Sequence, residues 1–488
     1  MSQDDVAGTN SGNAEGSVFD LLERKADGNY NVTRIAPGER FTDTGNAKRY
    51  AYQHGNKVRW VHLRGEWLVW DGNRWKPDTL CQAQALAQET TATICAEAVQ
   101  FSGDSKEKAL KHALRSESAA ARGAMVELAK SEPGIAIDPE SLDTNPMLLN
   151  VQNGTINLNT GIMRDPNPKD LITHISKTAF HGEGSLCPIW HSFLDTIFGG
   201  DQELISYIQR AVGYSLTGKV SEQCLFFLYG TGSNGKTTLM EAIQYALGEY
   251  ASTTRAETLL AKERDSSDQY YVANLVGVRL VIASELDEGR RFAEAKIKDL
   301  TGGDTITARF PFGRPFQFNP EFKLWIFGNH KPDIRGTDEG IWRRIHLIPF
   351  KVQISKQDRD LDLGDKLQKE AAGILNWALQ GCLEWQAQGL NPPKAVTDAT
   401  KDYRSEQDVL GTFLEERCDI SNKEYEIKAN WLYTAYREWA NSTGEFAVSN
   451  KRFSNALIER GFLRVKASTI KYKGLRLNTQ DDPRYLDN

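Results

Sequence analysis

The sequence predicts an α/β protein with a P-loop NTPase core, an α+β domain before the core and a winged-helix domain after it. Three observations support this fold class. An apolar run at residues 224–229 ends at a glycine-rich turn that opens a helix. Aromatic segments and turn signals alternate near the N-terminus, and a basic helix with two alternating segments lies near the C-terminus. A chain of 488 residues also favours several domains, because one domain has about 150 residues.

The composition is typical of a soluble globular protein. Hydrophobic residues make up 40% of the chain and charged residues 25%. No apolar run approaches the ~18 residues of a membrane span, and the polar N-terminus lacks the apolar core of a signal peptide. The six cysteines are scattered without a C-x-x-C pair, which favours reduced thiols and no zinc site. We therefore expect a cytoplasmic protein that does not bind membranes.

The N-terminal part of the chain is expected to contain a disordered segment followed by a folded domain. Residues 1–45 are rich in Gly, Asn, Asp and Ser, which predicts a disordered segment. The α+β domain at residues 46–188 begins with aromatic-rich strand candidates between residues 59 and 75. The tryptophans of these strands are interpreted as core residues, with base-stacking platforms as the alternative. They are Trp60, Trp67, Trp70 and Trp75.

Two helices and a returning strand pattern complete this domain. Hydrophobic periodicity predicts helices at residues 80–101 and 106–130. Alternation with two turn signals returns at residues 148–161. Residues 189–218 are expected to form helices that lead into the core, which extends to residue 400. The remaining residues, 401–488, are assigned to the winged-helix domain.

The core is predicted from a phosphate-binding loop. Residues 230–237 fit G-x-x-x-x-G-K-[ST] between an apolar strand and a helix that continues to a glycine stop. The glycines allow backbone N–H groups to surround phosphates at the positive end of a helix. Lys236 is expected to reach the β- and γ-phosphates of ATP, and the Thr237 hydroxyl to hold Mg²⁺. The expected nucleotide-binding residues are Gly230, Thr231, Gly232, Ser233, Asn234, Gly235, Lys236, Thr237 and Thr238.

A second apolar strand, at residues 278–284, ends in an acid, Glu285. A carboxylate at the carboxyl end of a strand beside the phosphate loop can polarise the attacking water. We therefore expect Glu285 to be the catalytic base and, with Thr237, to hold Mg²⁺. Ser284 precedes it, so water or Asp287 is expected to help bind the metal. The alternative is a strand that simply ends at a polar turn.

Two further segments carry candidate catalytic residues. The strand at residues 322–328 ends at Asn329, whose side chain could hydrogen-bond the γ-phosphate or the lytic water. The alternative is an asparagine favoured by the turn before Lys331-Pro332. Arg343 and Arg344 precede the apolar strand at residues 345–350. A guanidinium supplied in trans stabilises charge on the transferring phosphoryl group, although adjacent arginines also occur as plain surface charge.

A hairpin between these strands is a candidate DNA contact. The segment at residues 298–318 reads as strand, tight turn and strand. Guanidiniums suit phosphates, and an aromatic side chain suits a base or sugar. A surface hairpin with incidental arginines is the alternative. The expected DNA-binding residues of this segment are Lys298, Arg309, Phe312 and Arg314.

The C-terminal segment is basic in a chain of net charge −6. That net charge argues against a protein coated in nucleic acid, but local charge decides whether one region binds DNA. Residues 449–460 read as a recognition helix, and residues 462–477 as the two strands of a wing. A basic face on a protein-interaction module is the alternative. The expected DNA-binding residues here are Lys451, Arg452, Lys471 and Lys473.

Together these segments resemble helicase superfamily III, in particular the phage or plasmid primase-helicase type related to the poxvirus primase-helicase. TDTGNAKRY, WLVWDGNRW and LLNVQNGTINLNTG resemble its N-terminal helicase-associated domain. GTGSNGKTT, VIASE, IKDLTGGDTITAR, LWIFGNHKP and GIWRRIHLIPF resemble its ordered core motifs and arginine-finger segment. The resemblance implies an AAA+ core, a homo-hexameric ring and ATP-driven unwinding with 3′ to 5′ polarity on single-stranded and forked DNA. It also implies hydrolysis by Lys236, Thr237, Glu285, Asn329 and Arg343 or Arg344.

One departure from the family pattern changes the expected activity. About 45 polar residues precede the helicase-associated region, so the N-terminal primase of many family members is not expected. The D-x-D run at residues 358–362 is interpreted as a solvated turn and helix cap. We therefore expect no primer synthesis, and a primase or replication initiator encoded separately by the mobile element in its bacterial host.

The leading hypothesis is thus a replicative DNA helicase of a phage, plasmid or other mobile element. The alternative from another class is an origin-binding or DNA–protein remodelling AAA+ ATPase whose hydrolysis does not separate strands. A P-loop small-molecule kinase is disfavoured, because it leaves the arginine pair and the basic C-terminal segment unexplained.

Overall fold

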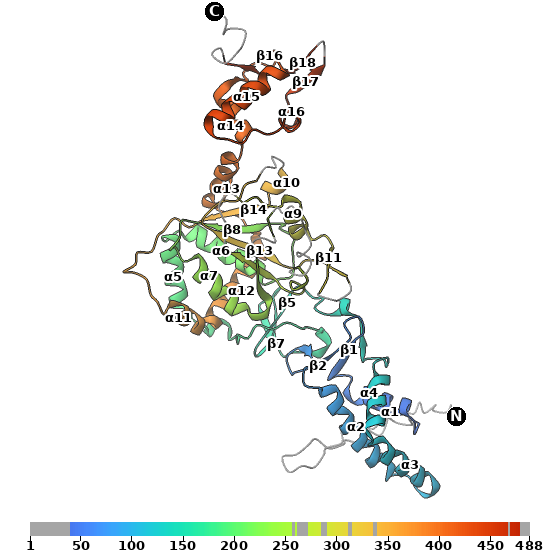
Figure 1. The fold of residues 1–488 in the computed structure, drawn as a ribbon. Helices are drawn as coiled ribbons and strands as arrows, with labels where there is room; N and C mark the ends of the chain where they lie inside the picture. The colour runs from blue at the N-terminus through green and yellow to red at the C-terminus, as the bar shows by residue number, and fades with distance from the viewer. Residues whose placement is uncertain are drawn as a thin grey trace, which may run out of the picture. The chain divides into compact units, whose positions relative to one another are not determined.

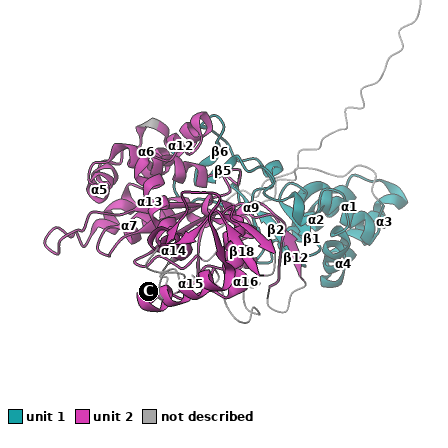
Figure 2. Cartoon of the chain, turned by 90° about the horizontal axis from the view of Figure 1, so that it is seen from above, with its two compact units in different colours: residues 1–180 teal, residues 181–488 magenta. Residues whose placement is uncertain are grey.

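The computed structural model describes residues 40–255, 259–260, 272–284, 290–310, 315–334, 339–466 and 469–478. The chain divides into two compact units, Met1–Phe180 and His181–Asn488, which Figure 2 colours separately. Residues 1–39 of the segment expected to be disordered lie outside the described residues, and the first helix begins at Asp43.

The first unit combines a helical layer with two small sheets. One sheet has the strand order β3-β2-β1-β4, and the other is the antiparallel meander β5-β6-β7. Its elements are α1 (Asp43–His54), β1 (Val58–Val61), β2 (Glu66–Trp70), β3 (Trp75–Pro77), α2 (Gln82–Ala98), α3 (Gly103–Ser116), α4 (Ala119–Ala129), β4 (Ala136–Ile137), η1 (Pro139–Ser141), β5 (Leu148–Val151), β6 (Gly154–Asn157), β7 (Ile162–Arg164) and η2 (Pro168–Asp170).

The aromatic strands of this unit form its core, as the sequence predicts. Trp75 is fully buried and Trp60 is 9% exposed, and Trp67 packs against the same hydrophobic cluster as Trp60. Trp70 packs with Trp75, with ring centroids 5.6 Å apart. The base-stacking alternative is therefore not needed to explain them.

The single helix expected at residues 106–130 is wrong. α3 ends at Ser116 and α4 begins at Ala119, because Ser118 takes an extended conformation. The Ser118 side chain accepts a hydrogen bond from the Ala121 N–H, so it caps the second helix. Serine is among the residues preferred at this position, since its hydroxyl satisfies one of the unpaired N–H groups of a helix start.

The second unit contains a five-stranded parallel sheet with the order β14-β8-β13-β10-β9 (Figure 1). Its central strands β8, β13 and β10 are near-continuous apolar runs, as expected for a sheet covered on both faces, whereas the edge strand β9 is mostly polar. The elements up to the end of the core are η3 (Gly182–Gly184), α5 (Pro188–Phe198), α6 (Gln202–Ser215), β8 (Leu225–Tyr229), α7 (Lys236–Leu247), η4 (Gly248–Tyr250), β9 (Ala251–Arg255), β10 (Leu280–Ser284), α9 (Glu294–Gly302), β11 (Ile306–Ala308), β12 (Phe316–Phe318), β13 (Lys323–Gly328), α10 (Glu339–Trp342), β14 (Ile345–Pro349), α11 (Leu363–Lys369), α12 (Ala371–Gln388) and α13 (Lys394–Glu406).

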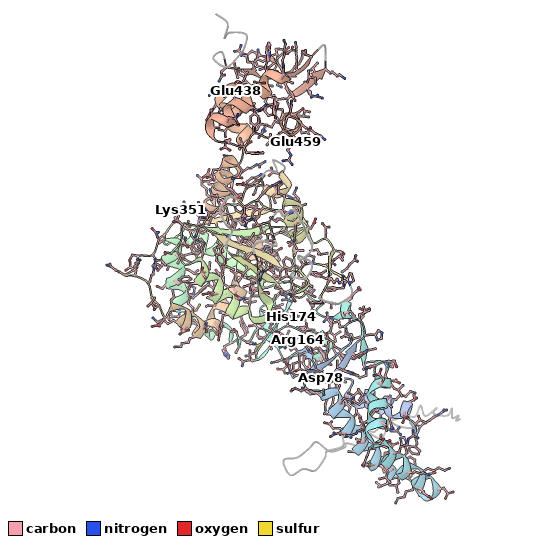
Figure 3. All side chains as sticks on the ribbon, in the orientation of Figure 1. Asp78, Arg164, His174, Lys351, Glu438 and Glu459 are labelled. Carbon is pink, nitrogen blue, oxygen red and sulfur yellow. The ribbon has the colours of Figure 1, made fainter. Side chains whose placement is uncertain are left out.

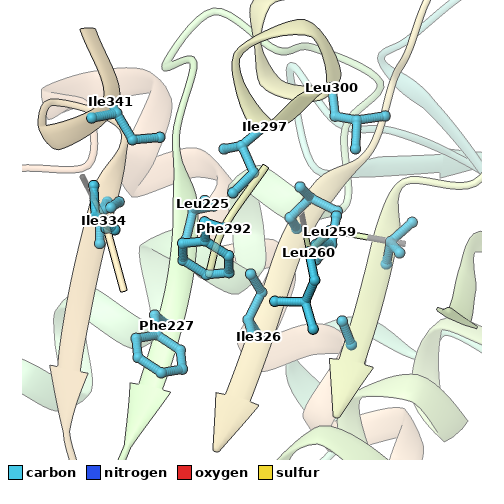
Figure 4. Close-up of a cluster of buried hydrophobic side chains, with 14 of the residues drawn as sticks. Leu225, Phe227, Leu259, Leu260, Phe292, Ile297, Leu300, Ile326, Ile334 and Ile341 are labelled. Carbon is cyan, nitrogen blue, oxygen red and sulfur yellow. The ribbon is translucent and has the colours of Figure 1, made fainter. Parts of the chain in front are cut away.

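The two faces of the sheet are covered by different helices. Leu225, Phe227 and Ile326 point to the face that packs against Ile297 of α9 and Ile341 of α10 (Figure 4). On the opposite face, the Trp325 indole donates a hydrogen bond of 3.0 Å to Ser215 of α6. The Tyr207 hydroxyl of the same helix is hydrogen-bonded to Nδ1 of His346 on β14, at 2.6 Å. α6 and α9 therefore fix the sheet from opposite sides.

The predicted hairpin is confirmed at β11 and β12, but residues 298–302, which the sequence interpretation also read as strand, belong to the helix α9. β11 and β12 pair antiparallel, with Ile306 opposite Phe318 and Ala308 opposite Phe316. Thr305, Thr307 and Arg309 are exposed, whereas Ala308 is fully buried. The alternation of faces is therefore the one that the sequence predicts.

The C-terminal helices and strands form a separate hydrophobic core around Phe413, Tyr436 and Phe453. The helix predicted at residues 449–460 and the two strands predicted at residues 462–477 are confirmed within a few residues. Its elements are α14 (Val409–Arg417), β15 (Cys418–Asp419), β16 (Glu426–Lys428), α15 (Ala429–Thr443), α16 (Asn450–Glu459), β17 (Leu463–Lys466), β18 (Ile470–Lys473) and β19 (Arg476–Leu477).

α6 and α12 approach each other closely through two glycines. A Cβ atom on Gly213 would lie 2.1 Å from the backbone nitrogen of Cys382, and one on Gly381 would lie 2.0 Å from the carbonyl oxygen of Gln209. Both contacts are with backbone atoms, which a side-chain rotation cannot move. The contact between these helices therefore requires glycine at both positions.

We expect Gly213→Ala and Gly381→Ala to lower the free energy of unfolding by about 1–3 kcal/mol each, since overpacking forces the helices apart. Alanine is the better helix former by ~1 kcal/mol, so intrinsic propensity predicts the opposite sign. Chemical denaturation monitored by circular dichroism measures the effect. Gly364→Ala in α11 is the matched control, because a Cβ atom there meets nothing within 4 Å. Equal stability of all three variants would contradict the close approach.

Candidate nucleotide-binding site

The predicted phosphate-binding loop connects β8 to α7 at the carboxyl edge of the parallel sheet. Gly232 and Gly235 have φ angles of +94° and +83°, a backbone conformation that glycine adopts without steric cost. Gly230 is confined instead by space, because a Cβ atom would lie 2.6 Å from the carbonyl oxygen of Phe350. A Cβ atom on Gly235 would lie 2.6 Å from Ile197 of α5. A side chain at any of these three positions would thus be sterically unfavourable.

Lys236 is the first residue of α7 and is only 5% exposed. Its ammonium group donates hydrogen bonds to the Gly230 carbonyl (2.7 Å), to Asn234 Oδ1 (3.0 Å) and to Asn329 Oδ1 (3.2 Å). Burial lowers the pKa of Lys236. Asn234 is 3% exposed, and its Nδ2 atom has no hydrogen-bond partner among the described residues. A buried donor without a partner is costly, and an acceptor oxygen of a ligand in the loop would satisfy it.

Asn329 reaches Lys236 because β13 and β8 are neighbours. The two strands pair in parallel, with Gly328 opposite Tyr229, so Asn329 and Gly230 follow at the same edge. β10 lies on the other side of β13, and Ser284 pairs with Phe327. Glu285 and Asp287, the expected base and its neighbour, lie outside the described residues.

These residues open into a cavity of about 1190 Å³. Thr237 and Thr238 line it, together with residues of α5 and of the segment that follows β14. The residues of this second group are Pro188, Ile189, Ser192, Phe193, Thr196, Ile354, Asp358, Arg359, Asp360, Leu361 and Leu363. A cavity of this size accommodates a nucleotide-sized ligand. The donor set of a buried lysine, an unpaired amide and the Thr237 hydroxyl fits a phosphate group with a bound Mg²⁺ ion.

The two candidate arginine fingers have different environments. Arg344 is 7% exposed and donates hydrogen bonds to Thr301 Oγ1 (3.1 Å) and to the Gly340 carbonyl (2.6 Å). Arg343 is exposed, and its guanidinium donates to Gln223 Oε1 at 3.1 Å. Arg344 therefore holds α9 and α10 together, whereas Arg343 faces solvent.

Arg343 lies at the opposite edge of the sheet from the phosphate loop. β14 pairs in parallel with β8, so Ile345 lies opposite Leu225 and Pro349 opposite Tyr229. Arg343 precedes these strands and contacts Gln223, whereas the loop follows Tyr229. The five residues of β8 span roughly 16 Å at about 3.3 Å per residue. One arginine side chain does not bridge that distance to the loop of its own subunit.

Part of the candidate DNA surface lies among the described residues. Arg309 is exposed on the hairpin, and Lys298 lies on α9, partly exposed. Phe312 and Arg314 lie outside the described residues. The sequence interpretation overlooked Phe310, which is 45% exposed and stacks on Phe316 with centroids 5.3 Å apart. Its position directly after Arg309, near the tip of the predicted hairpin, could have identified it as a candidate contact.

The positive charge of the C-terminal surface is smaller than its lysines and arginines alone would give. Lys451 and Arg452 are exposed on α16. Lys471 and Lys473, however, both form ion pairs with Glu426 of β16, at 2.8 and 3.1 Å. Their hydrogen bonds lower the pKa of Glu426, so its carboxylate offsets part of their charge.

Arg359 was not among the predicted site residues. Its guanidinium donates a hydrogen bond of 2.6 Å to Ser233 Oγ of the phosphate loop. The D-x-D run that contains it does form an exposed turn, and Asp362 precedes α11. The Asp362 side chain makes no capping hydrogen bond, and the run lines the cavity, which the interpretation as a solvated turn did not include.

Two protein-family models match the chain. The model described as "D5 N terminal like" matches residues 47–199, and a "Family of unknown function (DUF5906)" matches residues 228–344. A viral protein named "putative helicase", from Acanthamoeba polyphaga mimivirus, is 31% identical over 338 residues. The chain therefore contains a D5 N terminal like domain and a DUF5906 domain and is homologous to viral proteins named putative helicase or primase. The first match runs from α1 to the end of α5, and the second from β8 to the arginine pair.

Other viral proteins are similar to this chain as well. A "putative helicase" of Frog virus 3 is 26% identical over 51% of this chain, and a "putative primase" of African swine fever virus is 25% identical over 62%. The mimivirus match covers 64% of this chain and 35% of the relative. The aligned region spans about a third of the length of each of these relatives. A solved C-terminal region of NrS-1 covers 89% of this chain, with 12% identity and a TM-score of 0.46.

Among the helices that the structure describes, none combines the length and apolar character that crossing a bilayer requires.

Proposed function

We propose that the chain is an ATP-dependent DNA helicase that acts in replication. The observation that carries this proposal is the bond between Lys236 and Asn329 at one edge of a parallel sheet, with the exposed Arg343 at the other. Helicase and primase names among the D5-like relatives support a replication function. The strand order β14-β8-β13-β10-β9 supports an AAA+ type core, because it places the phosphate loop between the strands that bear Arg343 and Asn329.

In this proposal Lys236 contacts the β- and γ-phosphates of ATP, and Asn329 orients the γ-phosphate or the lytic water. Mg²⁺, held through Thr237 and Glu285, would neutralise charge on the phosphates. Glu285 would accept the proton of the attacking water. Lys236 already occupies the bottom of the loop, so its charge needs little reorganisation when the nucleotide binds.

Arg343 is proposed as the finger that completes the site of a neighbouring copy. Its exposure and its distance from the loop of its own subunit support a ring, and family resemblance favours a homo-hexamer. Arg344 is proposed as a positioning residue, because its hydrogen bonds to Thr301 and Gly340 fix the short helix that precedes Arg343. We also propose that the Arg309 hairpin contacts single-stranded DNA in the ring channel during 3′ to 5′ translocation.

The C-terminal part is proposed to be a winged-helix DNA-binding domain, with α16 as the recognition helix and β17–β18 as the wing. Three helices packed on an antiparallel sheet around one core support this assignment. A remodelling ATPase that does not separate strands is the second candidate. It is favoured by the incomplete positive charge of the wing, where Glu426 pairs with both candidate lysines of β18, Lys471 and Lys473.

Strand displacement on a forked duplex tests the proposal. With ATP and Mg²⁺, we expect wild-type protein to displace the strand from a fork with a 3′ single-stranded tail. Lys236→Ala should abolish both displacement and hydrolysis. Arg309→Ala should lower displacement at least tenfold while basal hydrolysis is retained, because Arg309 is distant from the phosphate loop in the sequence and on a separate hairpin. DNA-stimulated hydrolysis without displacement by the wild type would favour the remodelling ATPase.

Complementation in mixed rings tests the trans role of Arg343. We expect Arg343→Ala to lower ATP hydrolysis by ~10³-fold or more, as for other trans fingers. Mixing this variant with Lys236→Ala should restore part of the activity, since some interfaces then combine an intact loop with an intact Arg343. Steady-state ATP hydrolysis of the mixture measures the effect. Arg115→Ala, at an exposed arginine of α3, is the control and should retain full activity. A mixture no more active than its components would place Arg343 in cis or outside the site.

The ion pairs at Glu426 predict a gain of function. Glu426→Gln removes the carboxylate that offsets Lys471 and Lys473, so we expect tighter binding of blunt duplex DNA and a steeper salt dependence. The combined change Lys451→Ala with Arg452→Ala should weaken binding and reduce the slope of log K against log salt by about 2. Fluorescence anisotropy of the full-length chain at several salt concentrations measures both. Unchanged binding in all variants would indicate a protein-interaction module.

A further inference from the structure

A segment that follows β14 holds the phosphate loop from outside. Residues 351–362 connect β14 to α11, and Lys351 marks their start in Figure 3. The backbone N–H of Ile354 donates to the Ser233 carbonyl at 2.8 Å, and Arg359 donates to the Ser233 hydroxyl at 2.6 Å. Ser233 has a φ of +51°, a conformation in which residues other than glycine are uncommon. This segment therefore contacts both the backbone and the side chain of one loop residue.

The segment is ordered by its own turns. Ser355 donates a hydrogen bond of 2.7 Å to Asp358 Oδ2, and Lys366 of α11 forms an ion pair with Asp360. The hydrogen bond from Lys366 lowers the pKa of Asp360, so Lys366 offsets the charge of this carboxylate. Arg359, between these two aspartates, has a neutral hydroxyl as its hydrogen-bond partner among the described residues. Its guanidinium thus brings a second cation to the cavity that holds Lys236.

The cavity also has aliphatic lining residues. Ile189 of α5 is 36% exposed and Leu361 is 93% exposed, and both line the cavity, as does Leu363. A large aliphatic side chain held in solvent at a cavity rim suits the flat apolar face of a base, since ligand sites combine apolar walls with a few placed polar groups.

We propose that Arg359 is a nucleotide-contacting residue, supplied by the same subunit as the phosphate loop, and that Ile189 and Leu361 form the walls for the base. When a nucleoside triphosphate binds, the Arg359 guanidinium exchanges the Ser233 hydroxyl for a phosphate oxygen. The exchange is favourable because a hydrogen bond between two charged groups is about twice as strong as one to a neutral group. This inference rests on the proposed ATP-binding function of the loop.

Equilibrium binding of ATP and of tripolyphosphate to the full-length chain, in the presence of Mg²⁺, tests the proposal by calorimetry. Arg359→Ala is expected to weaken the binding of both ligands roughly 10–100-fold, as for the loss of a charged hydrogen bond. Leu361→Ser should weaken ATP binding severalfold and leave tripolyphosphate binding unchanged. Lys356→Ala is the matched control, because it removes one exposed positive charge from the same segment and does not line the cavity. It should bind ATP as the wild type does.

A second variant separates direct contact from positioning of the loop. Ser233→Ala removes the hydroxyl that now bonds to Arg359 but keeps the loop backbone, which is the part of Ser233 expected to contact phosphate. Its loss of ATP affinity should therefore be clearly smaller than that of Arg359→Ala, because the charged contact between Arg359 and phosphate remains. Equal losses in Ser233→Ala and Arg359→Ala would overturn the proposal, because Arg359 would then act only by holding the loop. Wild-type affinity in Arg359→Ala, or an equal loss in Lys356→Ala, would also overturn it. If the wild type itself binds no ATP, the proposed function fails instead.

The cis assignment has its own test in mixed rings. Arg359→Ala and Lys236→Ala damage the same site, so mixing them should restore no hydrolysis. The mixture of Arg343→Ala with Lys236→Ala is the positive control for exchange between subunits. Restoration by both mixtures would place Arg359 in trans and overturn the assignment.

Discussion

The parallel pairing of β8 with β13 and β14 is the constraint on which the candidate site depends. In a parallel sheet every carboxyl end lies at one edge, so the loop after β8 and Asn329 after β13 meet there. The same pairing places Arg343, before β14, at the other edge beside Gln223. One sheet thus separates the residues proposed to contact phosphate from Arg343, the finger proposed for a neighbouring copy.

Buried cations hold the segment that leads into β8. Lys323 at the start of β13 is 2% exposed, and its ammonium donates to the carbonyls of Thr217, Lys219 and Glu321. Burial lowers the pKa of Lys323 well below its ordinary value. Arg279, just before β10, donates to the Leu216 carbonyl at 2.7 Å. Carbonyl groups that lack strand partners are satisfied in this way, so the amino edge of the sheet is fixed as firmly as the edge that bears the loop.

The sequence predicted those features that depend on residues close together in the chain. It did not predict contacts between residues that are far apart in the chain. The phosphate loop, the β11–β12 hairpin and α16 follow from local periodicity and turn chemistry, and all were predicted. The choice between Arg343 and Arg344 depends on which of them is buried. Arg344 is the buried one, and its partner Thr301 lies on α9, far away in the sequence. Arg359 contacts Ser233 across 126 positions of sequence, and no local pattern reports such a contact. The pairing of Glu426 with Lys471 likewise depends on the register of β16 and β18.

α13 connects the two edges of the sheet. Lys331, two residues after Asn329, pairs with Glu406 at 2.6 Å, and the Tyr403 hydroxyl donates to the Pro332 carbonyl. The Tyr403 ring also packs edge-on against Trp342, the residue before Arg343, with centroids 5.3 Å apart. Tyr403 is fully buried, so a shift of the chain after Asn329 cannot occur without a response from α13. Side chains of α13 thus contact both the segment that follows Asn329 and the residue that precedes Arg343, and the chain continues from α13 into α14.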